Sequence, residues 1–270
     1  MQTAFAANSM LSRGALSAAH TTAPMSPSFP SNASAMILAA GRGTRMQPLT
    51  DTTPKPLLEV HGRPLMQWSM EGLARGGFGQ MVINTAWLGE QIESRWAGWS
   101  ETHPTSRLSY SREGLDFGYA LETAGGISRA LPLLDEVFWI LAGDVFVPEF
   151  VFEQSSVDRF TQSPMLAHLW LVPNPAHNLK GDFGLSDAGL ALNQADEKFT
   201  YSTIGLYRRA LFQAPWSDIV PGNPQGTAAA LAPLLRAAMD SSLVSAELYA
   251  GAWTDVGTPE RLAELNQSPG

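Results

Sequence analysis

Cysteine is absent from this chain of 270 residues. Its absence excludes disulfide bonds, thiolate metal sites and cysteine nucleophiles from the structure and the chemistry. A chain without cysteine suits a reducing compartment, so we expect a cytoplasmic location. Long apolar runs are missing as well, since no stretch approaches the roughly 18 residues that a membrane-spanning helix needs. We therefore expect a soluble protein with no membrane partner.

Positive charge is also scarce. The chain has 17 lysines and arginines against 25 aspartates and glutamates, which gives a formal net charge of −8. Binding to a nucleic acid backbone requires a basic face, so the sequence predicts no nucleic acid partner. A local group of cations can still hold a small anion, and Arg42, Arg45, Lys55 and Arg63 stand within one short stretch. A scatter of solvated surface cations is the alternative interpretation.

Acidic residues are absent from residues 1–34, which are rich in Ala, Ser, Thr and Pro. A segment of this composition buries too little apolar surface to fold, so a disordered tail is predicted. A start codon assigned too early is the alternative, because three later methionines are candidates. We assign residues 35–265 to a single domain and residues 266–270 to a short tail.

Short β-type runs alternate with helical patterns from residue 35 onward. Strands are predicted at residues 35–40, 80–83, 108–111, 137–142, 165–172, 199–207 and 248–253. Helices are predicted at residues 64–75, 88–96, 125–134 and 227–239. This alternation is typical of a three-layer α/β fold with right-handed crossovers.

A glycine-rich loop follows the first predicted strand, in the stretch LAAGRGTRMQPLTDTTPKPLLEV at residues 38–60. A loop in this place lies at the carboxyl edge of the sheet, where open α/β folds bind ligands. Gly41 and Gly43 allow a ligand to approach the backbone closely, and loop amides can cradle phosphate. The loop contains no GxxxxGK[ST] sequence. It does not match GxGxxG either, because Met46 stands where that motif has its last glycine. A structural turn is the alternative for this motif taken alone.

Lys55 stands between Pro54 and Pro56 in the same stretch. Each proline fixes its own backbone and pushes the preceding residue towards an extended form. We therefore expect Lys55 on a stiff, extended segment. Holding a point charge in place in advance is useful where charge develops during a reaction.

Taken whole, the stretch resembles the signature of the sugar-1-phosphate nucleotidyltransferases, LAAGxGTRxxPLT followed by PKPLxxV. The resemblance implies a three-layer Rossmann-like (GT-A-like) fold with a mixed, mostly parallel central sheet. It also implies that the loop wraps a nucleoside triphosphate, that Arg45 contacts the phosphates and that Lys55 contacts the reacting phosphoryl groups. The nucleotide-binding residues carried over from the signature are Leu38, Ala39, Ala40, Gly41, Gly43, Thr44, Arg45 and Lys55.

Two aspartates match further motifs of that family. Asp144 follows the strand at 137–142, and Asp255 lies in WTDVGTPERL. Each has an ordinary explanation by itself, as a turn residue or as a helix cap. The pair resembles the family's GD and WxDxGTP motifs, whose aspartates hold the catalytic Mg²⁺. Magnesium commonly neutralises phosphate charge in such reactions while held by only one or two carboxylates, so the resemblance implies Mg²⁺ as cofactor.

Other elements resemble the parts of the family that surround the base and the sugar. The stretch LETAGG at residues 121–126 is similar to the family's LGTAG element, and Asn84 ends the second predicted strand. This implies further nucleotide-binding residues at Asn84, Ala124 and Gly125. The implied sugar-binding residues are Glu122, Asn174, Asp182, Thr203 and Ile204. Isolated Asn and Asp in loops are usually turn formers, which is the alternative for this group.

The order of VINTAWLGEQIE, LETAGGI, VPNP, GDFGL, TIGLYRRALF and WTDVGTPERL narrows the resemblance. It is similar to the N-acetylmuramate α-1-phosphate uridylyltransferases of peptidoglycan recycling, over about residues 35–265. That group converts UTP and N-acetylmuramate α-1-phosphate into UDP-N-acetylmuramate and pyrophosphate. This chain departs from it at Ala124, where LETGGG is usual, and in a longer segment at residues 113–120.

The departures lie near the base and the sugar, so alternatives stay open. The same chemistry could use glucose 1-phosphate or mannose 1-phosphate with UTP, dTTP or GTP. A catalytically dead regulator that binds nucleotide sugars is a second alternative, and a bare nucleotide-binding module is a third. An enzyme selective for N-acetylmuramate should meet its lactyl carboxylate with a cation, for which Lys180 and Arg129 are candidates.

Overall fold

The computed structural model describes residues 33–267. The tail predicted at residues 1–34 lies outside the described residues, except for Ala33 and Ser34, which are buried in the fold. Of the tail predicted at 266–270, residues 266 and 267 belong to the last helix and the rest lies outside. None of the helices between residues 33 and 267 has the length and apolar character needed to cross a bilayer.

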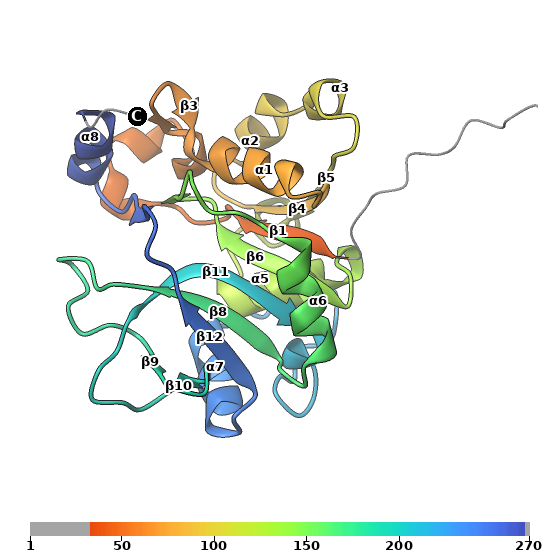
Figure 1. Ribbon diagram of the computed structural model, residues 1–270. Helices are drawn as coiled ribbons and strands as arrows, with labels where there is room; N and C mark the ends of the chain where they lie inside the picture. Colours follow the sequence, from red (N-terminus) through yellow and green to blue (C-terminus); the bar gives the residue numbers. More distant parts are fainter. Residues whose placement is uncertain (1–32, 268–270) are drawn as a thin grey trace, which may run out of the picture.

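Seven strands form the central sheet, in the order β12-β8-β11-β6-β1-β4-β5 (Figure 1). They are β1 (Ser34–Leu38), β4 (Gln80–Thr85), β5 (Arg107–Arg112), β6 (Val137–Ala142), β8 (Ala167–Val172), β11 (Thr200–Arg208) and β12 (Val244–Leu248). The pairs among β6, β1, β4 and β5 are parallel, and so is the pair of β12 and β8. Only β11 runs antiparallel to its neighbours β6 and β8. This confirms the predicted mixed, mostly parallel sheet.

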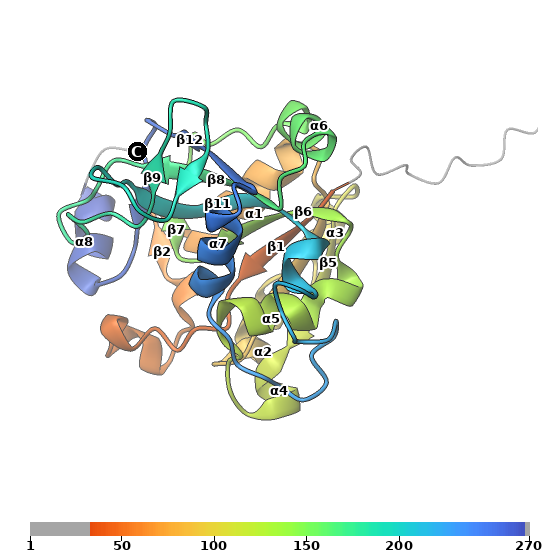
Figure 2. The ribbon, with the colours of Figure 1, turned by 90° about the horizontal axis from the view of Figure 1, so that it is seen from below.

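Helices cover both faces of the sheet. They are α1 (Leu65–Arg75), α2 (Gly89–Arg95), α3 (Trp99–Thr102), α4 (Glu113–Phe117), α5 (Glu122–Ala130), α6 (Gln154–Gln162), α7 (Leu231–Asp240) and α8 (Pro259–Gln267). One apolar cluster joins the sheet to α1, α2, α3 and α6, and a second joins the opposite face to α5 and α7. Figure 2 shows α5 and α7 next to one another on that opposite face. The three predicted layers are therefore present.

The apolar runs of β1 and β6 explain their central position. Successive side chains of a strand point to opposite faces, and in β6 Trp139 joins the first cluster while Phe138 and Ile140 join the second. All three are almost completely buried. A strand that is apolar on both faces fits only where helices cover the sheet on both sides.

Two predicted elements need correction, and helix α6 has no counterpart among the predicted ones. The helix predicted at 227–239 begins at Leu231, because Ala229 instead pairs its backbone with the start of α5. The strand predicted at 248–253 is wrong, because the edge strand of the sheet is β12 at residues 244–248. Polar residues alternate with apolar ones in β12, so it does not form a continuous apolar run. Helix α6 was missed because only Val157 and Phe160 of its residues are buried, so its apolar stripe is short.

Candidate active site

A cavity of about 760 Å³ opens where β1 and β6 end. Its walls come from the glycine loop, from the end of β6, from the segment that enters α5, from β11 and from α7. The predicted residues that line it are Leu38, Ala39, Ala40, Gly41, Gly43, Thr44, Arg45, Lys55, Asn84, Glu122, Asp144, Asp182 and Thr203. The carboxyl edge of a parallel sheet is where such folds bind ligands, so the predicted location agrees with the observed cavity.

Gly43 is required by the shape of the loop. Its φ of 65° is left-handed, and a Cβ there would lie 3.1 Å from Thr50 Cγ2 and 3.3 Å from the Cβ of Lys55. Thr50 Oγ1 donates a hydrogen bond of 2.8 Å to the Gly43 carbonyl and holds the turn. A Cβ on Gly41 would meet nothing within 4 Å, so the space beside Gly41 is open to a ligand.

Two arginines of the loop have different surroundings. Arg42 donates to the Thr50 carbonyl and to Asp51, and its guanidinium lies 3.9 Å from the centre of the Trp87 ring. Hydrogen bonds from Gln47 and Arg42 lower the pKa of Asp51. Arg45 is exposed and lines the cavity. Arg42 thus fastens the loop, while Arg45 is placed to meet a ligand.

Lys55 is held inside the cavity wall, although not in the manner predicted. It begins the 3-10 turn η3 (Lys55–Leu57) instead of lying on an extended segment, and only Pro54 before it is extended. Hydrogen bonds from the Leu57 and Leu58 amides close this turn. The residue is 9% exposed, and its Nζ donates to Asp144 Oδ2. The lysine is still presented rigidly, because the turn and its ion pair fix it.

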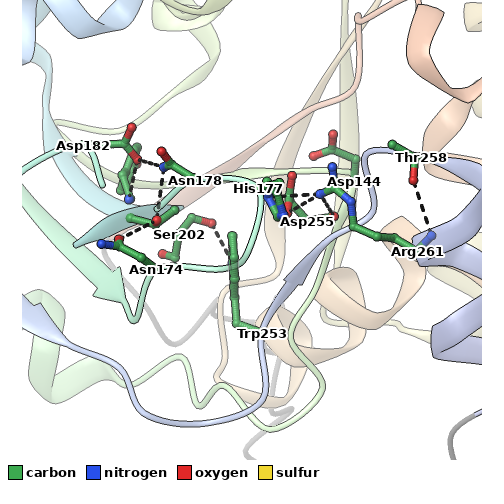
Figure 3. A network of polar contacts seen from close by, with 12 residues as sticks. Asp144, Asn174, His177, Asn178, Asp182, Ser202, Trp253, Asp255, Thr258 and Arg261 are labelled. Carbon is green, nitrogen blue, oxygen red and sulfur yellow. Dashed lines mark hydrogen bonds and ion pairs between the residues drawn. The ribbon is translucent and has the colours of Figure 1, made fainter. Parts of the chain in front are cut away.

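Asp144 and Asp255 come together through a short two-stranded ribbon. Strand β7 (Val145–Phe146) pairs antiparallel with β13 (Thr254–Asp255), and the Val256 amide donates to the Asp144 carbonyl over 3.0 Å. Figure 3 shows the two aspartates as neighbours although they are distant in the sequence. The ribbon therefore puts one aspartate from the middle of the chain beside one from its end.

Each of these carboxylates already has a cationic partner. Asp255 Oδ1 accepts a hydrogen bond of 2.7 Å from Arg261 Nη1 and lies 2.8 Å from His177 Nε2 (Figure 3). Asp144 is paired with Lys55. Asp144 lines the main cavity, whereas Asp255 lines a second cavity of about 590 Å³ together with His177 and Arg261.

The donor set of this ribbon fits magnesium. Within residues 33–267, no group of three or more His, Cys, Asp or Glu side chains is arranged to hold a metal. Mg²⁺ needs fewer, because it is usually bound by one or two carboxylates with substrate phosphates and water completing the shell. The side chains of Asp144 and Asp255 are 33% and 26% exposed, so both remain accessible. The assignment of a metal pair stays a prediction.

Asn84 connects two walls of the cavity. Its Oδ1 accepts from the Ala39 amide and its Nδ2 donates to Glu113 Oε1, both over 2.7 Å. Glu113 Oε2 accepts in turn from the Leu121 amide over 2.7 Å. The predicted contact of Asn84 with a nucleoside has to compete with these bonds. Sequence reasoning missed Glu113, whose one available signal was a carboxylate placed directly after β5.

Burial raises the pKa of the Glu113 carboxyl. A raised pKa of an acid in the folded state means that folding disfavours its charged form, so stability falls as pH rises through the raised pKa. We expect Glu113→Gln to lack this loss. As pH rises, the unfolding free energy of the wild type should therefore decrease relative to that of the variant. Denaturant unfolding at several pH values between about 4 and 8 measures it. The exposed Glu136→Gln is the matched control, and equal pH dependence in all three proteins would contradict the expectation.

The LETAGG element lies partly behind the cavity wall. Glu122 lines the cavity with a left-handed φ of 57°. Ala124 and Gly125 are buried outside the lining, and their amides donate to the Ala229 carbonyl. A Cβ on Gly125 would come within 2.4 Å of the Thr227 carbonyl. The small residues here therefore admit the chain before α7, and the nucleotide contact implied for Ala124 and Gly125 stays a prediction.

The predicted sugar-side residues separate into two groups. Asp182 and Thr203 line the cavity, whereas Asn174 and Ile204 do not. Asn174 donates to the Lys198 carbonyl and so stabilises a loop, which is the structural role expected for an isolated Asn in a loop. Ile204 is fully buried in the core. Thr203 has a φ of 67°, and its buried Oγ1 has no hydrogen-bond partner among residues 33–267.

Neither cation proposed for the lactyl carboxylate lies in the cavity wall. Arg129 is paired with Asp116 and lies over the Phe117 ring, and Lys180 is exposed outside the lining. Arg236 of α7 lines the cavity instead. Sequence reasoning missed it because an arginine in an amphipathic helix carries no sign of which surface it faces.

Comparisons with known proteins agree with this fold and identify the family. Residues 34–269 match the family model described as Nucleotidyl transferase. The chain is 43% identical over 244 residues to the N-acetylmuramate alpha-1-phosphate uridylyltransferase of Neisseria meningitidis serogroup B, covering 87% of this chain and 98% of the relative. It is 38% identical over 113 residues to the enzyme of that name from Caulobacter vibrioides, covering 42% and 43%. The chain therefore belongs to the nucleotidyl transferase family.

Solved structures support the same fold. The CTP:phosphocholine cytidylyltransferase of Streptococcus pneumoniae superposes with a TM-score of 0.63 at 17% identity, over 87% of this chain and 97% of that one. At this identity the likeness concerns the fold alone. Together with the family match, it confirms the Rossmann-like nucleotidyltransferase fold predicted from the signature, and the protein is a nucleotidyltransferase.

Proposed function

We propose that this enzyme transfers a uridylyl group from UTP to N-acetylmuramate α-1-phosphate and releases pyrophosphate. The observation that carries the proposal is the meeting of the glycine loop, Lys55 and Asp144 in one cavity wall. The choice of uridylyl and N-acetylmuramate is supported by 43% identity to a relative of that activity, of which 98% is covered.

The proposed reaction is a single displacement. An oxygen of the sugar phosphate forms a bond to the α-phosphorus of UTP, and the bond from that phosphorus to the bridging oxygen breaks as pyrophosphate leaves. The nucleophile is already ionised at neutral pH, so the chain need not supply a general base. Arg45 and Lys55 would bind the triphosphate and stabilise the charge that develops on the transferred and departing groups.

A divalent cation, Mg²⁺ by proposal, would be held by Asp144 and Asp255 and would supply further neutralisation of the phosphate charge. The ion pairs at these carboxylates give Lys55 and Arg261 a positioning function. Lys55 and Arg261 hold the aspartates in place and balance their charge, so the site is organised in advance. The glycine loop contributes amides to the nucleotide side, and Asp182 and Thr203 stand on the sugar side.

We further propose a cytoplasmic enzyme of peptidoglycan recycling, with one catalytic domain at residues 35–265 and no nucleic acid or membrane partner. Two other functions are distinguishable. The first is the same transfer with glucose 1-phosphate or mannose 1-phosphate and UTP, dTTP or GTP. The second is a regulator that binds nucleotide sugars and has no turnover, for which the presence of Lys55, Asp144 and Asp255 is an argument against.

A substrate panel tests this assignment. Pyrophosphate release is measured with each pairing of UTP, dTTP and GTP with the 1-phosphates of N-acetylmuramate, N-acetylglucosamine, glucose and mannose, in the presence of Mg²⁺. We expect the highest kcat/KM with UTP and the N-acetylmuramate substrate, by about 10-fold or more over the other pairs, since one well-placed polar contact discriminates by this much. A higher value with a neutral sugar would replace the assignment. Tight nucleotide-sugar binding without pyrophosphate release would favour the regulator.

A further inference from the structure

Positive charge lines the cavity at only three of its described residues, which are Arg45, Lys55 and Arg236. Arg45 belongs to the glycine loop and Lys55 lies beside that loop, paired with Asp144, and the proposed function assigns both to the phosphates. Arg236 comes from α7, and its guanidinium lies near the Phe183 ring in the cavity wall. If the substrate carries a negative group besides its phosphates, Arg236 is the one cationic side chain on the α7 side of the described lining that can bind it.

Arg236 is fixed in place without being neutralised. Its Nη1 donates to Asn193 Oδ1 over 2.7 Å, and its guanidinium lies 5.5 Å from the centre of the Phe183 ring. The Asn193 amide donates in turn to Asp240, over 3.1 Å and 3.4 Å to its two oxygens. A neutral amide thus stands between the arginine and this carboxylate, and Arg236 has no ion pair within residues 33–267.

The remaining donors of Arg236 suit a carboxylate. A guanidinium has five N–H donors in a planar fork that matches the two oxygens of a carboxylate. In the part of the chain that the structure describes, only Nη1 donates to the protein. Nε and Nη2 are left for a ligand, and such a charge-assisted pair is stronger where water is partly excluded.

Apolar side chains also line the cavity, and one of them, Phe183, lies against the guanidinium of Arg236. Phe183, Leu231 and Leu235 belong to one apolar cluster and line the cavity, and all three are less than 9% exposed. A bare phosphate or a second hydroxyl would gain nothing from them. A carboxylate carried on a short branched alkyl group would contact both the arginine and the apolar residues.

We propose that Arg236 forms a carboxylate-binding subsite, which selects sugar 1-phosphates that carry an acidic substituent such as a lactyl ether. The inference rests on the proposed function for the position of the sugar. It replaces Lys180 and Arg129 as the candidates for this contact. Arg236 acts here in specificity, and the displacement at phosphorus does not depend on it.

The test compares two substrates that differ only in the lactyl group, N-acetylmuramate α-1-phosphate and N-acetylglucosamine α-1-phosphate, with UTP. We expect Arg236→Gln to lower kcat/KM for the acidic substrate by about 10- to 100-fold, mainly through KM, as the loss of a hydrogen bond to a charged group implies. The neutral substrate should change by less than about 2-fold. Gln keeps the bond to Asn193 possible and much of the packing on Phe183, which protects folding.

Lys180→Gln is the matched control, because it removes an exposed cation outside the cavity lining and should leave both substrates unchanged. A second readout is metal-free binding of UDP-N-acetylmuramate and UDP-N-acetylglucosamine by calorimetry, where only the acidic ligand should lose affinity in Arg236→Gln. Equal losses for both substrates, or no loss for either, would overturn the subsite. Failure of the proposed function looks different, since wild type would then release no pyrophosphate from UTP or would prefer the neutral sugar.

Discussion

Lys55→Ala should lower kcat by at least about 10²- to 10³-fold, the range found when one preorganised electrostatic contact to a developing charge is removed. The side chain is 11% exposed, and its charge is aimed at Asp144 from a closed 3-10 turn. Its position is therefore set before a ligand arrives. A contact that strengthens only as charge develops is lost from kcat, so the change in KM should be smaller.

Steady-state kinetics of pyrophosphate release measures this loss, with circular dichroism as a check on folding. Removing Lys55 leaves Asp144 without its partner, but that carboxylate is 33% exposed, so solvent limits the cost to stability. Lys180→Ala removes an exposed lysine outside the cavity and should keep the wild-type rate. A folded Lys55→Ala protein with a nearly normal kcat would remove Lys55 from the proposed chemistry.

Asp144→Asn and Asp255→Asn form the second prediction, and each should lower kcat by about 10²-fold or more under saturating UTP, because metal charge at a phosphoryl centre is worth several kcal/mol. The ribbon of β7 and β13 places both residues together, so they should act as a unit. The double variant is then expected to lose little more than the worse single variant, as for residues that share one function.

A direct binding measurement separates this effect from a structural one. Titration with Mn²⁺, followed by electron paramagnetic resonance, should show weaker binding in both variants. Asp255 also anchors Arg261 and His177, so the melting temperature of Asp255→Asn should fall more than that of Asp144→Asn. The exposed Asp218→Asn serves as a charge-matched control. Near-normal rates in both aspartate variants would exclude the metal pair.

The fold was predictable where the reasons for it are local. The strand of six residues at 137–142 was predicted with its observed bounds, because a run that is apolar on both faces suits only a central strand. The strand at 244–248 was not predicted. Its alternation of Val244, Ala246 and Leu248 with polar residues is short, and it is recognisable as an edge strand only from its pairing with β8. Helix α6 was missed for the same kind of reason, because Val157 and Phe160 are recognisable as a core face only against the sheet.

The glycine loop illustrates how local chemistry specifies a site. Gly43 has the left-handed φ that glycine adopts freely, and the prolines beside Lys55 restrict the chain around it. These constraints act between near neighbours, so the sequence alone indicated a phosphate-binding loop, a rigid lysine and the family. Even here the turn at Lys55 was predicted as extended, because the closing hydrogen bonds of η3 outweighed the preference imposed by Pro56.

By itself the sequence determined the class of enzyme, the layered sheet and the loop, since these follow from short-range backbone preferences and apolar patterning. Tertiary structure alone decided that Gly125 packs against the chain at Thr227, that Asp144 meets Lys55, and that Arg236 lines the cavity where Arg129 does not. The physical reason is that these outcomes depend on contacts between residues far apart in the chain. Such contacts form only when the sheet and its helices have set the distances between them.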